Sequence, residues 1–457
     1  MENAVPSGLL GRVGRLTAAS MRTSMRVAML GPRTLLGTDS PRRLIEETHE
    51  AAAREMMETL GRLKGASMKV GQLASFIDAG IFPPEVRDIY QNALGSLRDK
   101  APPMRAAMVR EVIREELGHD VSELFGGFNG RPAAAASLGQ VHFARLHDGR
   151  EAAVKIQYPG IEEAIRSDLA MTHVMRPLLP LLAPGLEAGP AMEEIRIRAL
   201  EECDYLLEAS NLKALAEHHD GHPFARVPRP LPELSSRRVL TMERAAGLPF
   251  AHMKRLPQAE RNRIGEMLFR FYWGSLHRNG FTSADPHPGN YLLMEDGRMA
   301  FLDFGLACEL QPSTRPSLLR VFEALRDRDV DGLFAAAVDL GYVSRPDRTD
   351  PERFFRYVDF SLAPIAEDRE YTFTRDFIAE RTAVMMDPRN EWWSFVRHLN
   401  LPRWALLLYR LELGLFAVLA QLGATANWHR MTREFYGAEP STDLGRAEAD
   451  WLHARAA

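Results

Sequence analysis

The chain contains little cysteine and carries no excess of positive charge. Only two of its 457 residues are cysteine, Cys203 and Cys308. Two thiols give neither a zinc-site spacing nor a disulfide framework, which favours a reducing, cytoplasmic location. The formal net charge is −4, whereas nucleic-acid-binding proteins are usually basic, so nucleic acid is not an expected partner. A hydrophobic content of 46% and a charged content of 26% are typical of a globular protein.

The chain also lacks a long uninterrupted apolar run. Residues 1–8 contain no apolar core of the kind found in a secretory signal. The best candidate for a transmembrane helix is residues 404–426, but Arg410 and Glu412 interrupt it, so a buried helix is the better interpretation. Residues 9–30 are helix-like and basic, without an acidic residue. This segment suits peripheral contact with an anionic inner membrane, or a basic helix packed on its own protein.

Lysine is scarce, because only six of the 57 basic residues are lysine. Arginine serves almost everywhere that a positive charge is enough. The remaining lysines should therefore be enriched at positions that need a compact ammonium, such as a phosphate contact. Two of the six, Lys69 and Lys155, lie in segments that other observations single out, although chance alone can place two of six there.

Three polar residues, Asp285, Asn290 and Asp303, indicate the chemistry most strongly. The first two open and close the segment Asp-Pro-His-Pro-Gly-Asn, and Asp303 begins Asp-Phe-Gly. Apolar runs flank Asp296 and Gly297, which predicts a β-hairpin that brings Asn290 and Asp303 together. Phosphoryl transfer from ATP needs a carboxylate to orient the attacking group, here Asp285, and a carboxamide and a second carboxylate to hold Mg²⁺. Either segment alone is an ordinary polar turn, but together they favour an ATP site.

A second predicted hairpin places a lysine near the same phosphates. Asp148 and Gly149 form the expected turn, and Lys155 lies near the end of the second strand. A lysine there can project onto the α- and β-phosphates of ATP; the plainer interpretation is an edge-strand lysine that extends to solvent. The loop before the hairpin consists of small residues: Ala134, Ala135, Ala136 and Ser137. Small residues let backbone N–H groups approach phosphates, but they restrict the backbone more than glycine does.

The lysine needs a glutamate partner from a helix, and spacing does not select one. The candidates lie in or near a helical pattern that runs from Met192 to Leu215: Glu194, Glu201, Glu202 and Glu208. A strand is expected at residues 238–242. Just after it, Met242 and Glu243 would form the crossing point between a mainly β segment and a mainly helical one.

The chain is predicted to consist of a helical segment, a mainly β segment and a longer helical segment. After Gly247 the pattern is helical except for the hairpin at residues 291–303. The expected parts are a leader with a basic helix (1–43), a helical extension (44–128), a small lobe (129–243), a larger helical lobe (244–437) and a C-terminal tail (438–457).

Four short motifs together carry a resemblance to a known family. They are Lys69–Gln72, which reads Lys-Val-Gly-Gln; the alanine-rich loop Ala134–His142; Glu202–Asp204, which reads Glu-Cys-Asp; and Asp285–Asn290 with Asp303–Gly305. On these motifs, which lie within residues 64–307, the chain resembles the AarF/UbiB family of atypical, protein-kinase-like proteins associated with ubiquinone biosynthesis. Cys203 departs from the family pattern, because an aliphatic residue is usual at the middle of its motif.

The resemblance implies a fold, cofactors and residue roles. The fold would be α+β and two-lobed like a protein kinase, with a small β-containing N-lobe, a mainly helical C-lobe and an added N-terminal helical extension. The cofactors would be ATP and Mg²⁺, and Glu208 would be the helix partner of Lys155. Lys69 would reach the active site from the extension, with Glu202 and Asp204 as its counterparts beside Asp285.

The sequence therefore predicts an atypical kinase or ATPase in quinone or isoprenoid-lipid metabolism. Peptide phosphorylation is disfavoured, because no Ala-Pro-Glu segment follows Gly305. Two alternatives stay open: a small-molecule kinase of the aminoglycoside or choline type, which shares Asp-x-His-Pro-Gly-Asn, and a scaffold that binds ATP without turnover. The partners considered, besides ATP, are an isoprenoid or quinone lipid, a membrane surface and a second copy of the chain as a homodimer.

Overall fold

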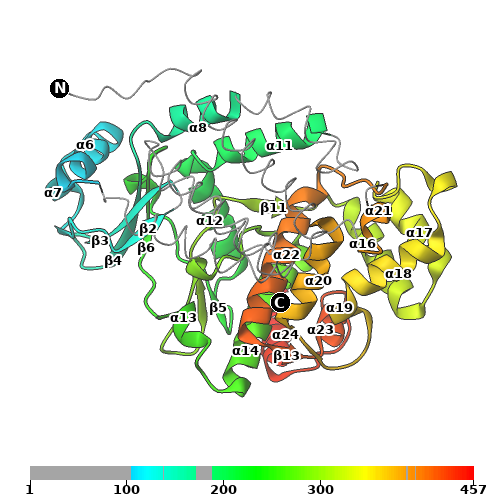
Figure 1. The fold of residues 1–457 in the computed structure, drawn as a ribbon. Coiled ribbons are helices and arrows are strands. Elements are labelled where there is room, and N and C mark those ends of the chain that lie inside the picture. The colour runs from blue at the N-terminus through cyan, green and yellow to red at the C-terminus, as the bar shows by residue number, and fades with distance from the viewer. Residues whose placement is uncertain (1–103, 137, 171–187, 387–389, 397, 457) are drawn as a thin grey trace, which may run out of the picture. The chain divides into compact units, whose positions relative to one another are not determined.

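The computed structural model describes residues 104–136, 138–170, 188–386, 390–396 and 398–456. The described residues belong to one compact unit, Met104–Ala457 (Figure 1). The expected leader, most of the expected helical extension and the Lys-Val-Gly-Gln motif with Lys69 lie outside the described residues.

The first sheet of the described part has five antiparallel strands. Its central order is β1 (Gly127–Phe128), β3 (Gly139–Arg145), β4 (Glu151–Gln157) and β6 (Val239–Glu243), with β2 (Ala134–Ala136) also paired to β3. The predicted turn between β3 and β4 is present, and Gly149 takes the positive φ of 89° that glycine tolerates without strain.

One face of this sheet is covered by helix α6 (Ala106–Leu117), which is followed by the short α7 (Val121–Leu124) (Figure 1). Alternate residues of β4, Ala152, Val154 and Ile156, are fully buried in a cluster that includes Val109 and Ile113 of α6. Because side chains alternate along a strand, Lys155 lies on the opposite face of the sheet from α6.

Among the described residues, three α-helices lie between β4 and β6: α8 (Ile161–Ala170), α11 (Ala188–Glu201) and α12 (Tyr205–His218). The continuous helix expected from Met192 to Leu215 was wrong, because the chain breaks between α11 and α12. The cause is Asp204, whose side chain accepts hydrogen bonds from the backbone N–H groups of Leu206 and Leu207. An aspartate in this role starts a new helix rather than continuing the old one.

The described residues form two further small sheets, besides a two-stranded ladder near the end of the chain. One has the order β5 (Ala225–Arg226), β10 (Met299–Phe301), β9 (Tyr291–Leu293) and β7 (Leu248–Pro249), and the other pairs β11 (Ala307–Glu309) with β8 (Phe281–Ser283). The predicted hairpin is β9–β10, with Gly297 at positive φ in its turn. The expectation of helix elsewhere after Gly247 was wrong at β7, β8 and β11, and also at β12 (Tyr371–Thr372) and β13 (Thr425–Ala426), because strands of two or three residues leave no periodic pattern.

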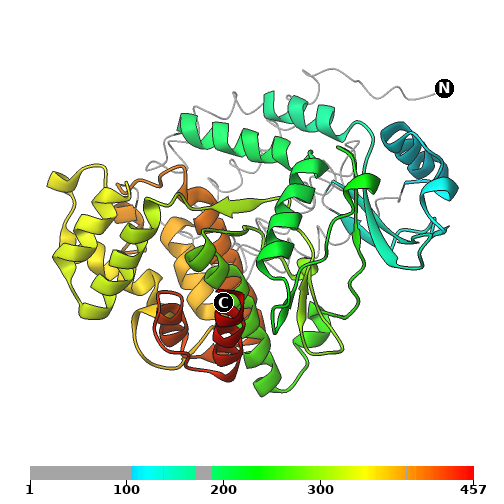
Figure 2. The ribbon, with the colours of Figure 1, turned by 180° about the vertical axis from the view of Figure 1, so that it is seen from behind.

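Helices make up most of the remaining chain: α13 (Phe250–Met253), α14 (Gln258–Phe269), a π-helical turn (Arg270–Gly274), α15 (Ser275–Asn279), α16 (Thr314–Asp327), α17 (Val330–Asp339), α18 (Pro351–Ser361), α19 (Ala363–Ala366), α20 (Arg375–Met386), α21 (Trp393–Val396), α22 (Ala405–Leu422), α23 (Trp428–Glu434) and α24 (Asp443–Ala456). A short ladder joins β12 (Tyr371–Thr372) to β13 (Thr425–Ala426). Figure 2 shows α16–α18 at the opposite end of this unit from the first sheet.

Helix α22 lies in the core of the helical part, against α14 and α20. Among the described residues it is the one helix long and apolar enough to cross a membrane by length and composition, and 56% of it is buried. Leu411, Leu415 and Leu419 are fully buried. A core position accounts for the apolar sequence, as expected.

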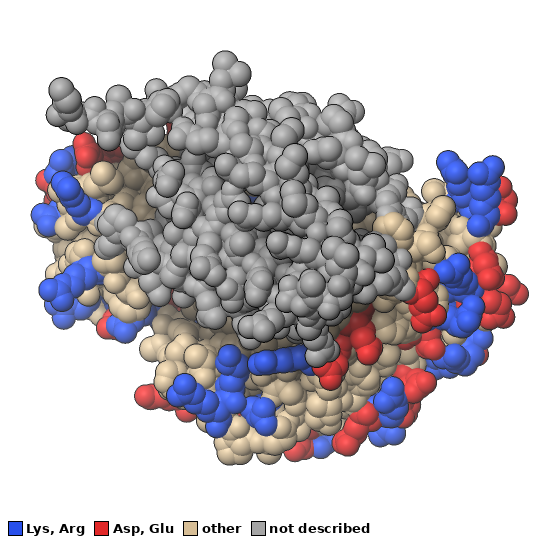
Figure 3. All heavy atoms as spheres, in the orientation of Figure 1, with Lys and Arg blue, Asp and Glu red and all other residues tan. Residues whose placement is uncertain are grey.

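The surface of the helical part carries both signs of charge. On the face shown in Figure 3, basic and acidic side chains are interspersed where α16, α17 and α18 lie. Ion pairs on or next to these helices include Arg320–Asp339 and Arg328–Asp359. This mixture agrees with the small net charge.

Residues 438–457, expected as a tail, contain α24, which packs on the helical part. Arg270, fully buried, contacts Glu434 at 2.7 Å and Glu448 of α24 at 3.1 Å. Gly445 lets α24 come this close, since a Cβ there would lie 2.6 Å from the Arg270 guanidinium.

Candidate active site

Lys155, Glu208 and Asp303 meet at one point from three separate elements. Lys155 comes from β4, Glu208 from the first turn of α12, and Asp303 follows β10. The Lys155 Nζ donates to both carboxylate oxygens of Glu208 at 2.8 Å and to Asp303 Oδ2 at 3.2 Å. The side chains of Lys155 and Glu208 are only 10% and 3% exposed. Of the four glutamates that spacing left open, the structure pairs Glu208 with the lysine.

Lys155 and Asp303 hold each other in the ionised state. Burial acts to lower the pKa of Lys155, but the carboxylates of Asp303 and Glu208 outweigh it and raise that pKa well above its usual value. Burial acts to raise the pKa of Asp303, yet Lys155 and the backbone N–H of Gly305 hold it below its usual value. Lys155 is therefore an ammonium and Asp303 a carboxylate at neutral pH.

Asp285 and Asn290 lie beside this group. The Asn290 Nδ2 donates to the backbone oxygen of Asp285 at 3.1 Å and to its carboxylate at 3.0 Å. The β9–β10 hairpin joins the two motifs, because the backbone N–H of Leu302 donates to the Asn290 carbonyl. Ser283 Oγ donates to the Asp303 carbonyl at 3.2 Å. The predicted meeting of Asn290 and Asp303 at the open end of the hairpin is thus present.

Arg410 is a site residue that the sequence interpretation missed. Its Nη2 donates to Asp285 Oδ1 at 3.1 Å from α22. The available signal was a charged residue within an apolar segment. Sequence reasoning used that signal only to argue against a membrane span.

A small cavity of about 30 Å³ lies among these groups. It is lined by Leu138, Lys155, Glu202, Tyr205, Glu208, Asp285, Asp303, Gly305 and Leu306. Burial, with the carboxylates of Asp285 and Asp303, raises the pKa of Glu202 to about 7, although Arg410 and Lys155 oppose the rise. Burial also raises the pKa of Glu208 to about 7, so both glutamates at this cavity can gain or lose a proton near neutral pH.

The other predicted site residues lie in several places. Asp204 does not line the cavity and caps α12 instead. Ala134, Ala135 and Ala136 form β2, the first two exposed, while Ser137 and Lys69 lie outside the described residues. At the end of β6, Met242 is buried and Glu243 pairs with Arg226 at 2.9 Å. Their proposed contacts with a nucleotide stay predictions.

The oxygen atoms present fit a magnesium ion that arrives with a nucleotide. Among the described residues no cluster of three or more His, Cys, Asp or Glu side chains could hold a metal ion. Mg²⁺ usually needs fewer, because one or two protein oxygens and the substrate phosphates complete its shell. Asp303 offers a carboxylate, and Asn290 uses its Nδ2 toward Asp285, which leaves its Oδ1 for an ion.

Comparisons with known proteins agree with this geometry. A family model described as the ABC1 atypical kinase-like domain matches residues 96–337. The chain is 32% identical over 296 residues to atypical kinase COQ8B, mitochondrial, of Rattus norvegicus, with 65% of this chain and 55% of that protein covered. It is 26% identical over 452 residues to atypical kinase COQ8, mitochondrial, of Saccharomyces cerevisiae, with 95% and 86% covered. The chain thus spans about half the length of the rat relative.

A solved structure shares the fold. The complex of Rv3197 with erythromycin from Mycobacterium tuberculosis matches with a TM-score of 0.62 and 32% sequence identity, covering 87% of this chain and 98% of that one. This match and the order of a sheet followed by a mainly helical region confirm the expected two-lobed, kinase-like class.

Proposed function

The chain belongs to the ABC1 atypical kinase-like family, and from this premise we propose that it binds Mg-ATP between its N-terminal sheet and its helical part and turns it over as a kinase or ATPase. The observation that carries the proposal is the contact of Lys155 with both Glu208 and Asp303. An ammonium fixed between a helix glutamate and the aspartate of Asp-Phe-Gly is the arrangement that phosphoryl transfer requires.

Each side chain at the site would act on a different part of the reaction. Lys155 would contact the α- and β-phosphates, with Glu208 keeping it in place. Asp303 and Asn290 would hold Mg²⁺, which neutralises the charge that develops on the phosphates. Asp285 would orient the attacking hydroxyl or water, because its carboxylate is fixed by Asn290 on one side and Arg410 on the other.

Peptides are poor candidates for the phosphate acceptor. The chain passes from Gly305 through β11 into α16, which begins at Thr314. This connection is too short for the long activation loop on which protein kinases dock peptides.

We favour a role in quinone or isoprenoid-lipid metabolism, supported by the family to which the motifs belong. The rat and yeast relatives named above are mitochondrial by name. For this chain we propose a cytoplasmic protein that contacts the inner membrane peripherally.

Replacing Asp303 tests the proposal. We expect Asp303→Asn to lower ATP turnover by about a hundredfold or more, because the bound metal and phosphates lose their carboxylate. The measurement is phosphate release from Mg-ATP by the full chain, with and without vesicles that contain a quinone. A matched control is Asp296→Asn, in the exposed turn of the same hairpin, where the side chain contacts only Arg298 among the described residues.

The two variants separate turnover from mere binding. Calorimetric titration with ATP reports whether each variant still binds nucleotide. If the wild-type chain turns ATP over and Asp303→Asn does so at the rate of Asp296→Asn, the proposed site is wrong. If the wild-type chain binds ATP without turnover, the scaffold alternative takes its place.

A further inference from the structure

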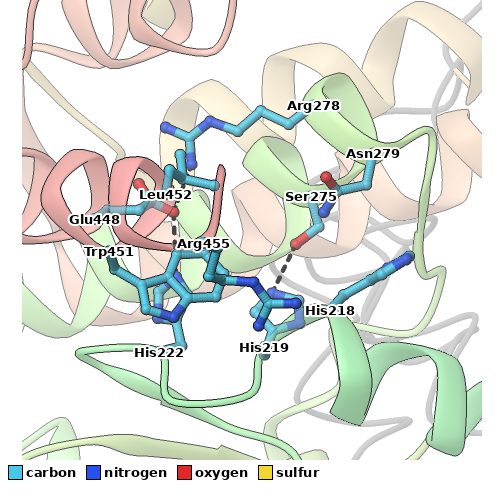
Figure 4. A pocket seen from close by; sticks show the side chains of 10 residues that line it. All are labelled: His218, His219, His222, Ser275, Arg278, Asn279, Glu448, Trp451, Leu452 and Arg455. Atoms are coloured by element: carbon cyan, nitrogen blue, oxygen red, sulfur yellow. Dashed lines mark hydrogen bonds and ion pairs between the residues drawn. The ribbon is translucent and has the colours of Figure 1, made fainter. Parts of the chain in front are cut away.

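A second and larger cavity lies away from the candidate active site, between α12, α15 and α24. It has a volume of about 140 Å³ and shares no lining residue with the first cavity. Ten side chains line it, as Figure 4 shows: His218, His219, His222, Ser275, Arg278, Asn279, Glu448, Trp451, Leu452 and Arg455. Nothing in the proposed nucleotide chemistry uses this place.

The acidic group in the wall is already neutralised. Glu448 is buried, and its carboxylate contacts Arg278 at 2.6 Å, Arg270 at 3.1 Å and the His222 ring at 3.4 Å. Both of its oxygens are therefore occupied by donors. A ligand in the cavity would not meet a free carboxylate there.

Two of the histidines in the wall are uncharged. The His222 Nδ1 accepts from the backbone N–H groups of Phe224 and Ala225, which places the proton on the Nε2 that faces Glu448. The His219 Nδ1 lies 2.9 Å from the Leu215 carbonyl, so it carries the proton, and its Nε2 accepts from Ser275 Oγ. Burial lowers the pKa of both rings.

The groups that a ligand could engage are mostly hydrogen-bond donors. Arg455 donates to the carbonyls of Glu217 and Asp220 at 3.1 and 3.0 Å. Within the part of the chain that the structure describes, it pairs with no carboxylate. Two further side chains, His218 and Asn279, have no hydrogen-bond partner among the described residues. Since Arg278 and Arg455 face a single acidic residue, Glu448, the wall carries one net positive charge.

An aromatic surface stands beside the unpaired guanidinium. The Arg455 guanidinium lies 5.0 Å from the centre of the Trp451 ring, and the same ring packs edge-on to His222 at 4.4 Å. In Figure 4 the Arg455 side chain runs from α24 toward His219 and Ser275. Leu452 adds apolar surface to the wall. A ring and an anionic group on one small molecule would match these two features together.

The volume sets the size of that molecule. A cavity of about 150 Å³ is known to hold one benzene ring, and this cavity has about the same volume. We propose that it binds a small aromatic carboxylate, with the ring against Trp451 and the carboxylate on Arg455. This site goes beyond the proposed function. The proposal is tested by measuring ligand binding and does not depend on ATP turnover.

Benzoate is the probe, and the full chain without nucleotide is the sample. Calorimetry and ligand-observed NMR should show saturable binding with a dissociation constant of about 1 mM or tighter. Benzamide lacks the charge and acetate lacks the ring, so each should bind about tenfold more weakly. Equal binding of acetate and benzoate would overturn the proposal, as would the absence of saturable benzoate binding at about 10 mM.

Two variants locate the site. Arg455→Gln and Trp451→Leu should each weaken benzoate binding about tenfold, because one removes the charge and the other the aromatic surface. Arg446→Gln, on the exposed face of the same helix beside Asp443, should leave binding unchanged. Thermal unfolding checks that α24 stays folded in all three. If both cavity variants stay folded and bind benzoate as the Arg446→Gln control does, benzoate binds elsewhere and the proposal is wrong.

Discussion

Glu202 is a side chain at the candidate active site that links pH to stability. Its pKa is raised from 4.5 to about 7, first by burial and then by the neighbouring carboxylates. Between these two pH values the folded chain keeps a proton that the unfolded chain has released. Stability from this group is therefore present at low pH and is lost as pH rises toward 7.

Glu202→Gln should remove that loss, because an amide has no proton to release. Without nucleotide, we expect the variant to gain stability over the wild type as pH rises, reaching about 2 kcal/mol near pH 8. Urea unfolding at a series of pH values measures the gain. Glu201→Gln is the matched control, since Glu201 pairs with Arg198 at 2.7 Å near the surface. A gain that follows the control at every pH would contradict the assignment.

Local sequence predicted the arrangement of some site residues and not of others. The turn at Asp296 and Gly297 predicted the hairpin that joins Asn290 to Asp303, because the turn residues and the apolar runs beside them lie within a few residues of each other. Arg410 is 125 residues away from Asp285. No periodicity or spacing connects residues so far apart, so only the packing of α22 brings them into contact.

At the level of elements, α22 contributes more than a core helix. Its apolar residues fill the helical part, yet Arg410 on the same helix holds Asp285. Arg410 also opposes the rise in the pKa of Glu202. A single helix thus affects both the orientation of the proposed catalytic carboxylate and the protonation of its neighbour.

Arg410→Gln should therefore change two measurements together. ATP turnover should fall about tenfold, because Asp285 loses a charged hydrogen bond. The pH midpoint at which Glu202 affects stability should move above 7, because a positive charge is removed. Arg410→Lys should restore the midpoint better than the turnover, because it keeps the charge without the planar guanidinium.

The control for Arg410 is Arg430→Gln, on the exposed surface of α23, where Arg430 pairs with Asp368. It removes an arginine and an ion pair without approaching the site. If Arg410→Gln matches this control in turnover and in the pH midpoint, α22 has only a packing role.

Element boundaries showed where sequence patterns fail. The apolar periodicity of residues 192–215 continues across Asp204, so the pattern predicted one helix instead of two. The break is caused by the Asp204 side chain, which accepts hydrogen bonds from two backbone N–H groups. A hydrophobic pattern contains no information about such a cap. Long strands such as β3 and β4 were predictable because their alternation and their turn agree.

At the scale of the whole molecule, the fold class was predictable because long stretches of the sequence have a strand pattern or a helix pattern, and their order follows the order of the parts. A sheet followed by a mainly helical region is confirmed by the structure and by the matched relative. The attachment of α24 was not predictable. It depends on Arg270, which lies 178 residues before Glu448 and looks like any other arginine in the sequence.

Arg270 joins α24 to the helical part through a buried ion-pair network. Its guanidinium contacts Glu266 at 2.7 Å, Glu434 at 2.7 Å and Glu448 at 3.1 Å, and its side chain is completely buried. Arg278 also contacts Glu448. Removing Arg270 would leave the Glu434 carboxylate buried without its ion-pair partner, and the other two with fewer donors. A buried charge that loses its partner costs far more than the ion pair itself contributes.

Arg270→Met should lower the free energy of unfolding by about 3–5 kcal/mol, because Met fills the space and leaves the buried Glu434 carboxylate without its cation. Urea unfolding near pH 7 measures the loss. Adding Glu434→Gln to Arg270→Met should recover part of it, since one of the unpaired charges is then removed. Arg446→Gln, on the exposed face of α24, should change the free energy by less than about 0.5 kcal/mol. A loss below about 1 kcal/mol for Arg270→Met would show that α24 is held by its apolar contacts, with the buried charges contributing little to its attachment.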